Sequence, residues 1–381
     1  MIGSMSKRVY LDYNATSPLD PRVSAEILRV MQLFGNASSI HSEGREARGL
    51  VDEARVQVAA LLHCDHRQVV FTSGGTEANN LAILGAARAN RERGRHMITS
   101  AIEHSSVLGA FRQLQKEGFG VSFVSPTPEG IIEAAAVSEV IREDTVLISI
   151  MMANNEGGTL QPVREISALA HDRGILMHTD AVQALGKVSL DVQDLGADLV
   201  TVSAHKIYGP KGAGALYVHK NAQIAPLFFG GTHERGMRPG TENHVAIHGF
   251  GVAAALLLNE GFPDLISLRD RLEAGLRQTS MTIVCKDAPR LPNTVNFFSP
   301  SWTGESMVMA LDLEGIAISN GSACSAGIIE PSHVIQALGY NEELARSVIR
   351  VSLGKFTTPE EIDYFLQVIH HLESIGTGVV S

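Results

Sequence analysis

The 381-residue sequence is poor in cysteine and has no cluster of positive charge. Its three cysteines, Cys64, Cys285 and Cys324, are too few and too far apart for a disulfide framework or a Cys-x-x-Cys metal site. The net charge is −10, and no basic block is present that would neutralise a phosphate backbone. We therefore expect a reducing compartment, no metal ion and no direct contact with nucleic acid.

Long apolar runs are missing as well. No run reaches the roughly 20 residues that cross a bilayer, and no basic segment followed by an apolar core opens the chain. We expect a cytoplasmic protein with no membrane contact. Hydrophobic residues make up 44% of the chain and charged residues 19%, which is typical of a globular protein, and the length suits one large and one smaller domain.

Short β-branched runs alternate with helical patterns through the first two thirds of the chain. Apolar residues recur at helical spacing in residues 77–90 and 163–173, between runs that are typical of strands buried on both faces. We expect an α/β fold with a mainly parallel central sheet and helices on both faces. The expected strands are residues 69–72, 96–99, 145–150, 175–178, 199–202 and 214–218.

The pattern changes in the last third of the chain, where helices and separate strands indicate a smaller α+β domain. Its last helix is marked by a capping box, with Thr358 as N-cap and Glu361 three residues later. We expect a large domain at residues 15–250 and a small domain formed by residues 1–14 and 251–381.

Three successive predicted strands end in polar residues. The ends of parallel strands meet at one edge of a sheet, where such folds bind ligands. The polar residues that follow these strands are Asn154, Asn155 and Glu156, then Asp180 and Gln183, then Ser203, His205 and Lys206.

A fourth strand leads into Ser73-Gly-Gly-Thr-Glu77 and then a helix, which is typical of a phosphate site made by backbone amides and the Thr76 hydroxyl. Each motif has a simpler interpretation on its own: a glycine turn, a helix cap at Asp180, a solvated lysine at Lys206. Together they supply what pyridoxal phosphate (PLP) needs, namely an amine, a partner for the pyridinium nitrogen and an anion site.

The sequence resembles the NifS/IscS-type cysteine desulfurases, which belong to the class-V, fold type I group of PLP enzymes. The resemblance runs from Val9 to about Leu372. The segments that carry it are residues 9–16, 35–41, 72–80, 103–104, 153–156, 178–183, 203–212, 233–243 and 319–327.

The resemblance implies a role for each polar residue of the predicted cofactor site. Lys206 would hold PLP covalently and later move the α-proton of the substrate. Asp180 would pair with the pyridinium nitrogen, Gln183 would bind the phenolic oxygen, and His104 would stack on the ring. For His104, a buried structural histidine is the simpler interpretation of the sequence alone.

The resemblance also implies which residues bind the phosphate of PLP and that one of them comes from a second subunit. Gly75, Thr76, Ser203 and His205 would bind the phosphate in one subunit. Thr241 would reach the same phosphate from the other subunit, so a homodimer is expected.

Two further residues are implied to handle the substrate and its sulfur. Arg350 would bind the carboxylate of L-cysteine together with Asn155, although an internal salt bridge of Arg350 is the alternative. Cys324 lies among small residues, where a thiol has little to pack against. It would accept the sulfur as a persulfide, releasing L-alanine, and pass it to an iron–sulfur scaffold or another acceptor protein.

Other functions remain open at this point. The run Gly249-Phe-Gly-Val-Ala-Ala254 fits a loose dinucleotide fingerprint of a nicotinamide dehydrogenase, but it follows no buried strand and is better interpreted as close packing at a helix start. A second alternative is a non-catalytic sulfur-handling protein with the same fold. It would not need the family's residue at every catalytic position, and this sequence has them all. An aminotransferase would not need Cys324. A selenocysteine lyase shares most of these motifs and stays the main alternative.

Overall fold

The structure is a computed structural model that describes residues 8–321 and 331–376. Its centre is a seven-stranded sheet of order β2-β8-β7-β6-β5-β3-β4. Strand β8 is antiparallel to both of its neighbours and the other pairs are parallel, which confirms the expected mainly parallel sheet. The strands are β2 (Val69–Thr72), β3 (His96–Ser100), β4 (Gly120–Val124), β5 (Thr145–Ser149), β6 (Leu176–Asp180), β7 (Leu199–Ser203) and β8 (Gly214–Val218).

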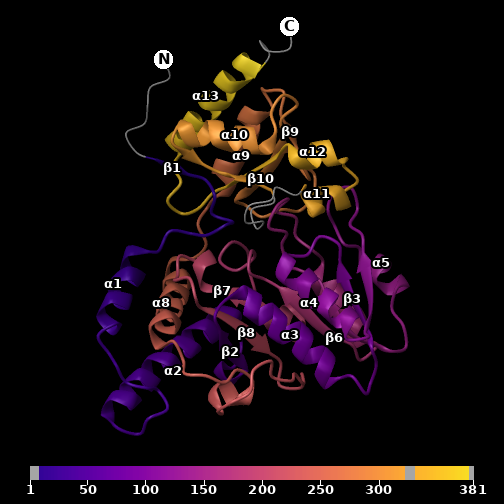
Figure 1. Ribbon diagram of the computed structural model, residues 1–381. Helices are drawn as coiled ribbons and strands as arrows, with labels where there is room; N and C mark the ends of the chain where they lie inside the picture. The colour runs from indigo at the N-terminus through magenta and orange to yellow at the C-terminus, as the bar shows by residue number, and fades with distance from the viewer. Residues whose placement is uncertain (1–7, 322–330, 377–381) are drawn as a thin grey trace.

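Helices cover both faces of this sheet (Figure 1). Successive strand residues point to opposite faces. Val70 and Met97 pack with α3 and α4, whereas Phe71 and Ile98 pack in the core that includes α2 and α8. The helices of this part are α1 (Pro21–Val30), α2 (Ser42–Leu62), α3 (Gly75–Ala89), α4 (Ser105–Lys116), α5 (Ala134–Glu139), α6 (Val163–His171), α7 (Val192–Leu195) and α8 (His244–Glu260).

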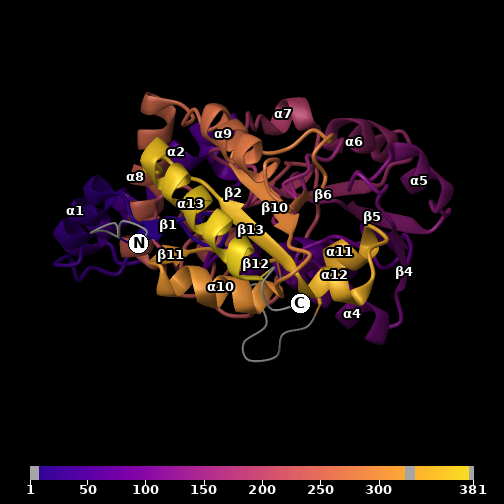
Figure 2. The same cartoon turned by 90° about the horizontal axis from the view of Figure 1, so that it is seen from above.

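A second group of elements lies above one edge of the large sheet (Figures 1 and 2). A four-stranded sheet of order β12-β13-β10-β9 and the parallel pair β1-β11 form its centre. The elements are β1 (Val9–Tyr10), α9 (Ile266–Leu276), β9 (Thr282–Ile283), β10 (Thr294–Phe298), α10 (Gly304–Leu313), β11 (Ile316–Ala317), β12 (Ser319–Asn320), α11 (His333–Ala337), α12 (Glu342–Arg346), β13 (Val348–Ser352) and α13 (Pro359–Gly376).

The expected capping box begins α13. The Thr358 backbone N–H donates to Glu361 Oε2 at 3.1 Å, and the Glu361 N–H donates to Thr358 Oγ1 at 3.3 Å. Two of the N-terminal amides of α13 are thereby satisfied, and its apolar stripe packs in the core of the smaller sheet.

The glycines at 249 and 251 lie inside α8, so their expected placement at a helix start is wrong. The helix begins earlier, at His244, because Asn243 caps it. Close packing is nevertheless their role: a Cβ on Gly251 would lie 2.5 Å from Cα of Ala54 in α2. Glycine therefore allows the two helices to touch.

The expected domain boundary at residue 250 also falls inside α8. Ala253 and Ala254 still pack in the core of the large sheet, whereas Val9 and Leu11 pack in the core of the smaller one. The division itself stays a prediction. Within residues 8–321 and 331–376, no helix is long and apolar enough to cross a membrane.

Candidate active site

A cavity of about 520 Å³ opens where the carboxyl ends of β5, β6 and β7 face the smaller sheet. These three strands are neighbours in the large sheet, which is why their polar ends come together. The residues that were singled out from the sequence and line this cavity are Gly75, Thr76, His104, Asn155, Asp180, Gln183, Ser203, His205, Lys206 and Arg350.

Two of the residues to which the resemblance gives a role are not among them. Thr241 is exposed and does not line this cavity within one chain. Cys324 lies outside the described residues. Both residues that flank the segment 322–330, Gly321 and Pro331, line the cavity.

Asp180 is the last residue of β6 and its carboxylate is buried. Oδ2 accepts a hydrogen bond from Asn79 Nδ2 at 2.6 Å, and Oδ1 accepts one from the Val182 backbone at 3.0 Å. These two donors fix the plane of the carboxylate at the floor of the cavity.

Lys206 follows β7 directly, in the short helical turn η2 (Ala204–Lys206). Its Nζ donates to the backbone oxygens of Asn14 and, at 2.9 Å, Ala15. Residues 14 and 15 thus form one wall around the amine, and they come from the N-terminal segment that leads out of β1.

His104 caps the N-terminus of α4. Its Nδ1 accepts a hydrogen bond from the Ser106 backbone at 3.2 Å, and since a backbone N–H can only donate, the ring proton is on Nε2. Burial lowers the pKa of His104, and Lys206 and His333 lower it further, against the opposing effect of Asp180. The ring is therefore a neutral imidazole.

The start of α3, a 15-residue helix that begins at Gly75, could hold an anion. Gly74 before it has φ +154°, and a Cβ on Gly214 would lie 2.6 Å from Cα of Gly74. The backbone amides at this helix end and the helix dipole favour a negative ligand. Thr76 adds a hydroxyl next to them.

His205 lies next to this anion site and contacts Thr16 Oγ1 through Nδ1 at 3.1 Å. Burial lowers the pKa of His205 to about 4, and Lys206 and Lys211 contribute. A neutral His205 can still donate one hydrogen bond to a phosphate.

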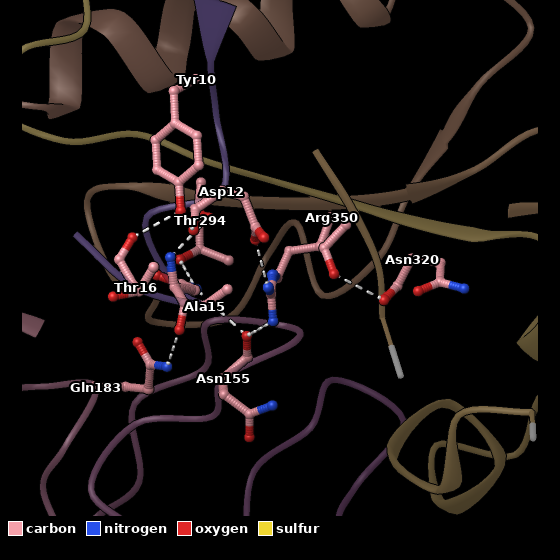
Figure 3. Close-up of polar contacts among 12 residues, drawn as sticks. Tyr10, Asp12, Ala15, Thr16, Asn155, Gln183, Thr294, Asn320 and Arg350 are labelled. Carbon is pink, nitrogen blue, oxygen red and sulfur yellow. Dashed lines mark hydrogen bonds and ion pairs between the residues drawn. The ribbon is translucent and has the colours of Figure 1, made fainter. Parts of the chain in front are cut away.

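Arg350 is buried in the middle of β13 and enters the cavity from the smaller sheet (Figure 3). Nη2 pairs with Asp12 Oδ1 at 2.7 Å, and Nη1 donates to the Asn155 backbone oxygen at 3.0 Å. The internal ion pair left open from the sequence is therefore present. Nε is buried and has no hydrogen-bond partner among the described residues.

Two carboxyl groups are buried at or near the cavity: Glu156 lines it, and Glu103 directly precedes the lining residue His104. Burial raises the pKa of Glu103 to about 8, although its Oε1 accepts hydrogen bonds from Ser100 and Met151. Burial raises the pKa of Glu156 to about 7, against the hydrogen bond from Ser332. Glu156 Oε2 lies close to residues on both sides of the segment 322–330. It accepts the hydrogen bond from Ser332 on one side, and a Cβ on Gly321 would lie 2.7 Å from it on the other.

The other two cysteines lie away from this cavity. Cys285 is buried, and burial raises its pKa to about 11. Cys64 is half-buried and lies in the turn after α2. Its pKa is raised to about 12, mainly by burial. Neither cysteine is a reactive thiolate at neutral pH.

Sequence reasoning missed several residues of the site. Asn14, Asn79 and His333 line the cavity. Asp12 pairs with Arg350, and Lys187 donates hydrogen bonds to Asn14 and Gln183, which are also lining residues. For Asn79 a signal existed, because it lies one helical turn after Gly75. Asp12 and Arg350 are 338 positions apart, so no local sequence pattern predicts their contact.

Comparison with known proteins fits this geometry. The family described as aminotransferase class-V matches residues 9–365. The chain belongs to the class-V aminotransferase family. It is 45% identical to a protein named cysteine desulfurase IscS from Shewanella baltica over 375 residues, covering 96% of this chain and 92% of that one. A protein of the same name from Vibrio vulnificus has the same identity and coverage.

Solved structures give the same result. A NifS-like protein superimposes with a TM-score of 0.90 at 36% identity, covering 97% of this chain and all of that one. A structure titled SspA in complex with cysteine superimposes with a TM-score of 0.82 at 37% identity, covering 92% of this chain. The expected fold and the resemblance to NifS/IscS-type cysteine desulfurases are confirmed.

Proposed function

We propose that this chain converts L-cysteine to L-alanine with PLP bound at Lys206, and that the sulfur passes to Cys324 as a persulfide. Its relatives are named cysteine desulfurase, and class-V aminotransferases depend on PLP. The observation that carries the sulfur step is that both flanks of the cysteine segment, Gly321 and Pro331, line the same cavity as Lys206 and Arg350.

The donor set suits PLP, which supplies an electron sink for the α-carbon of an amino acid when bound. Lys206 offers the amine, and Asp180 offers a fixed carboxylate to the pyridinium nitrogen. The start of α3 with Gly75 and Thr76 takes the phosphate. The remaining contacts come from Gln183 at the phenolic oxygen, from Ser203, His205 and the partner's Thr241 at the phosphate, and from His104 on the ring face.

The substrate binds at the opposite side of the cavity. Arg350 and Asn155, which both line the cavity, take the α-carboxylate, because a guanidinium matches the planar geometry of a carboxylate. The carbon–sulfur bond of cysteine breaks as the sulfur bonds to Sγ of Cys324. His104, with its proton on Nε2, and Lys206 move the protons that complete L-alanine.

A homodimer is part of the proposal. Phe34 and Ile40 are exposed apolar side chains on the segment whose Ser38 contacts His233 at 2.9 Å. His233 begins the segment that carries Thr241. The root of this segment is fixed by a buried pair, Glu234 with Arg55. An apolar surface beside a rigidly held segment suits a second copy of the chain.

The persulfide would be delivered to an iron–sulfur scaffold or another acceptor protein in the cytoplasm. A selenocysteine lyase is the competing function, and Cys324→Ala separates the two. The variant is incubated with L-cysteine or L-selenocysteine and L-alanine is quantified. We expect bound PLP, almost no alanine from cysteine and residual alanine from selenocysteine, because selenium leaves with less help. Wild-type alanine formation from cysteine would overturn the proposal.

A further inference from the structure

Lys187 is a lysine of the site that the proposed chemistry does not use. It is not among the residues that line the cavity, but it contacts two that are, Gln183 and Asn14. Its Nζ donates to Gln183 Oε1 at 2.7 Å and to Asn14 Oδ1 at 2.8 Å. No carboxylate among the described residues lies within ion-pair distance of Lys187, so its contacts are both with amide oxygens.

The amine donates to both oxygens whatever its charge. Burial lowers the pKa of Lys187 well below its ordinary value, and the charges of Lys206 and Arg350 add to this. A neutral amine still has two N–H groups, which match the two oxygens, and an ammonium has three.

This contact decides which way the Gln183 carboxamide points. A carboxamide has an oxygen on one side and an NH2 group on the other, and only the oxygen can face a donor. With Oε1 held by Lys187, Nε2 points the opposite way and donates to the Asn14 backbone oxygen at 2.9 Å. The same oxygen accepts from Lys206 Nζ, so Nε2 lies beside the amine that would carry the cofactor.

The side chain of Asn14 is fixed by further hydrogen bonds to residues other than Lys187. Its Oδ1 also accepts from Asn293, its Nδ2 donates to Thr294 at 2.9 Å, and its side chain is almost fully buried. Lys187 therefore lies between a fixed residue, Asn14, and one that could rotate, Gln183.

We propose that Lys187 is a positioning residue that holds the Gln183 carboxamide so that Nε2, and not Oε1, faces the phenolic oxygen of PLP. This rests on the proposed role of Gln183. A donor at the phenolate spreads its negative charge and weakens its hold on the proton of the neighbouring imine nitrogen. Without Lys187, the contact of Nε2 with the Asn14 backbone oxygen is the remaining restraint on the carboxamide, and its oxygen can face the phenolate more often.

The test is a pH titration of the visible absorption band of the PLP-loaded protein in four forms: wild type, Lys187→Met, Gln183→Ala and the double variant. We expect the midpoint to rise by about one pH unit in each single variant, since one charge-assisted hydrogen bond is lost. The double variant should shift no further than the larger single shift. Lys116→Met, at the far end of α4, is the control and should titrate like wild type.

The possible outcomes distinguish the positioning role of Lys187 from the proposed role of Gln183 on which it rests. His104, Asp180 and Arg350 line the same cavity and are present in every variant, so they do not distinguish one variant from another. An unshifted Gln183→Ala midpoint would refute the role of Gln183 itself. A shifted Gln183→Ala with an unshifted Lys187→Met would refute the positioning role alone. Additive shifts would also refute it, because Lys187 would then act through its charge. PLP content and thermal melting verify folding, with Lys187→Leu as the second apolar variant.

Discussion

The two sides of the cavity are built in different ways. On the side of the large sheet, Asp180 and Lys206 sit at or just past the ends of adjacent strands, and His104 begins a helix. On the other side, Arg350 projects from the middle of a strand in a separate sheet, and its carboxylate partner, Asp12, comes from the N-terminal segment.

Under the proposed function, the large sheet would hold the cofactor and the smaller sheet would hold the substrate carboxylate. Groups at adjacent strand ends keep their spacing through the sheet itself, which suits a cofactor that stays bound. Arg350 contacts the large-sheet side through the Asn155 backbone oxygen and not through the strand ends that carry Asp180 and Lys206. Substitutions on the two sides should therefore give different defects, loss of cofactor on one and weaker substrate binding on the other.

The largest effect is expected at Lys206. Lys206→Ala removes the covalent attachment of PLP and the base, so turnover should fall by about 10³-fold or more. Borohydride reduction followed by mass analysis measures the attachment. Lys211→Ala, an exposed lysine nearby, serves as the matched control. Unchanged reducible attachment in Lys206→Ala would mean that another lysine holds the cofactor.

Asp180 should give the next largest effect. Asp180→Ala removes the charged partner of the pyridinium nitrogen, and we expect weaker PLP retention with turnover lowered by roughly 10²-fold. PLP content after dialysis and steady-state rates measure both. Asp180→Asn keeps the size and lacks the charge, so it should share the defect. Normal activity in either variant would contradict the assigned role.

Arg350 should show the other kind of defect. Arg350→Ala removes a charge-assisted contact to the carboxylate, which should raise the KM for L-cysteine about 10- to 100-fold while PLP stays bound. Arg350→Lys should fall between, because a lysine lacks the planar fork. Loss of PLP from Arg350→Ala would instead show that the two sides are not separable.

The smallest effect is expected at the cysteines away from the cavity. Cys64→Ser and Cys285→Ser should leave alanine formation within about twofold of wild type, because neither thiol reaches the substrate. Thermal melting should show a modest loss for Cys285→Ser, which buries a hydroxyl. A large loss of turnover in a stable variant of either cysteine would place it in the sulfur path.

Much of the large-sheet side could be predicted from the sequence. Buried strands have apolar runs, and the polar residues at their ends, such as Asp180 and Lys206, stand out against them. The resemblance added Gln183 and His104, whose local sequence is ambiguous. The capping box at Thr358 could also be predicted from the sequence, because it needs only contacts within one helical turn.

The rest depended on contacts between distant segments. The antiparallel insertion of β8 between β2 and β7 leaves no local pattern. Asn14 and Lys187 meet across 173 positions, and an isolated lysine after a turn is indistinguishable from a solvated one. The early start of α8 was missed because its first residues, near His244, are less apolar than its middle.

The most direct test of the central claim is the mass of the protein after reaction with L-cysteine. Wild-type protein loaded with PLP is incubated with L-cysteine, alkylated and analysed by intact mass and peptide mapping. We predict one extra sulfur that maps to Cys324, and none in Cys324→Ala, which keeps its PLP. An extra sulfur on Cys64 or Cys285, or wild-type alanine release without any sulfur on the chain, would contradict the transfer of sulfur to Cys324.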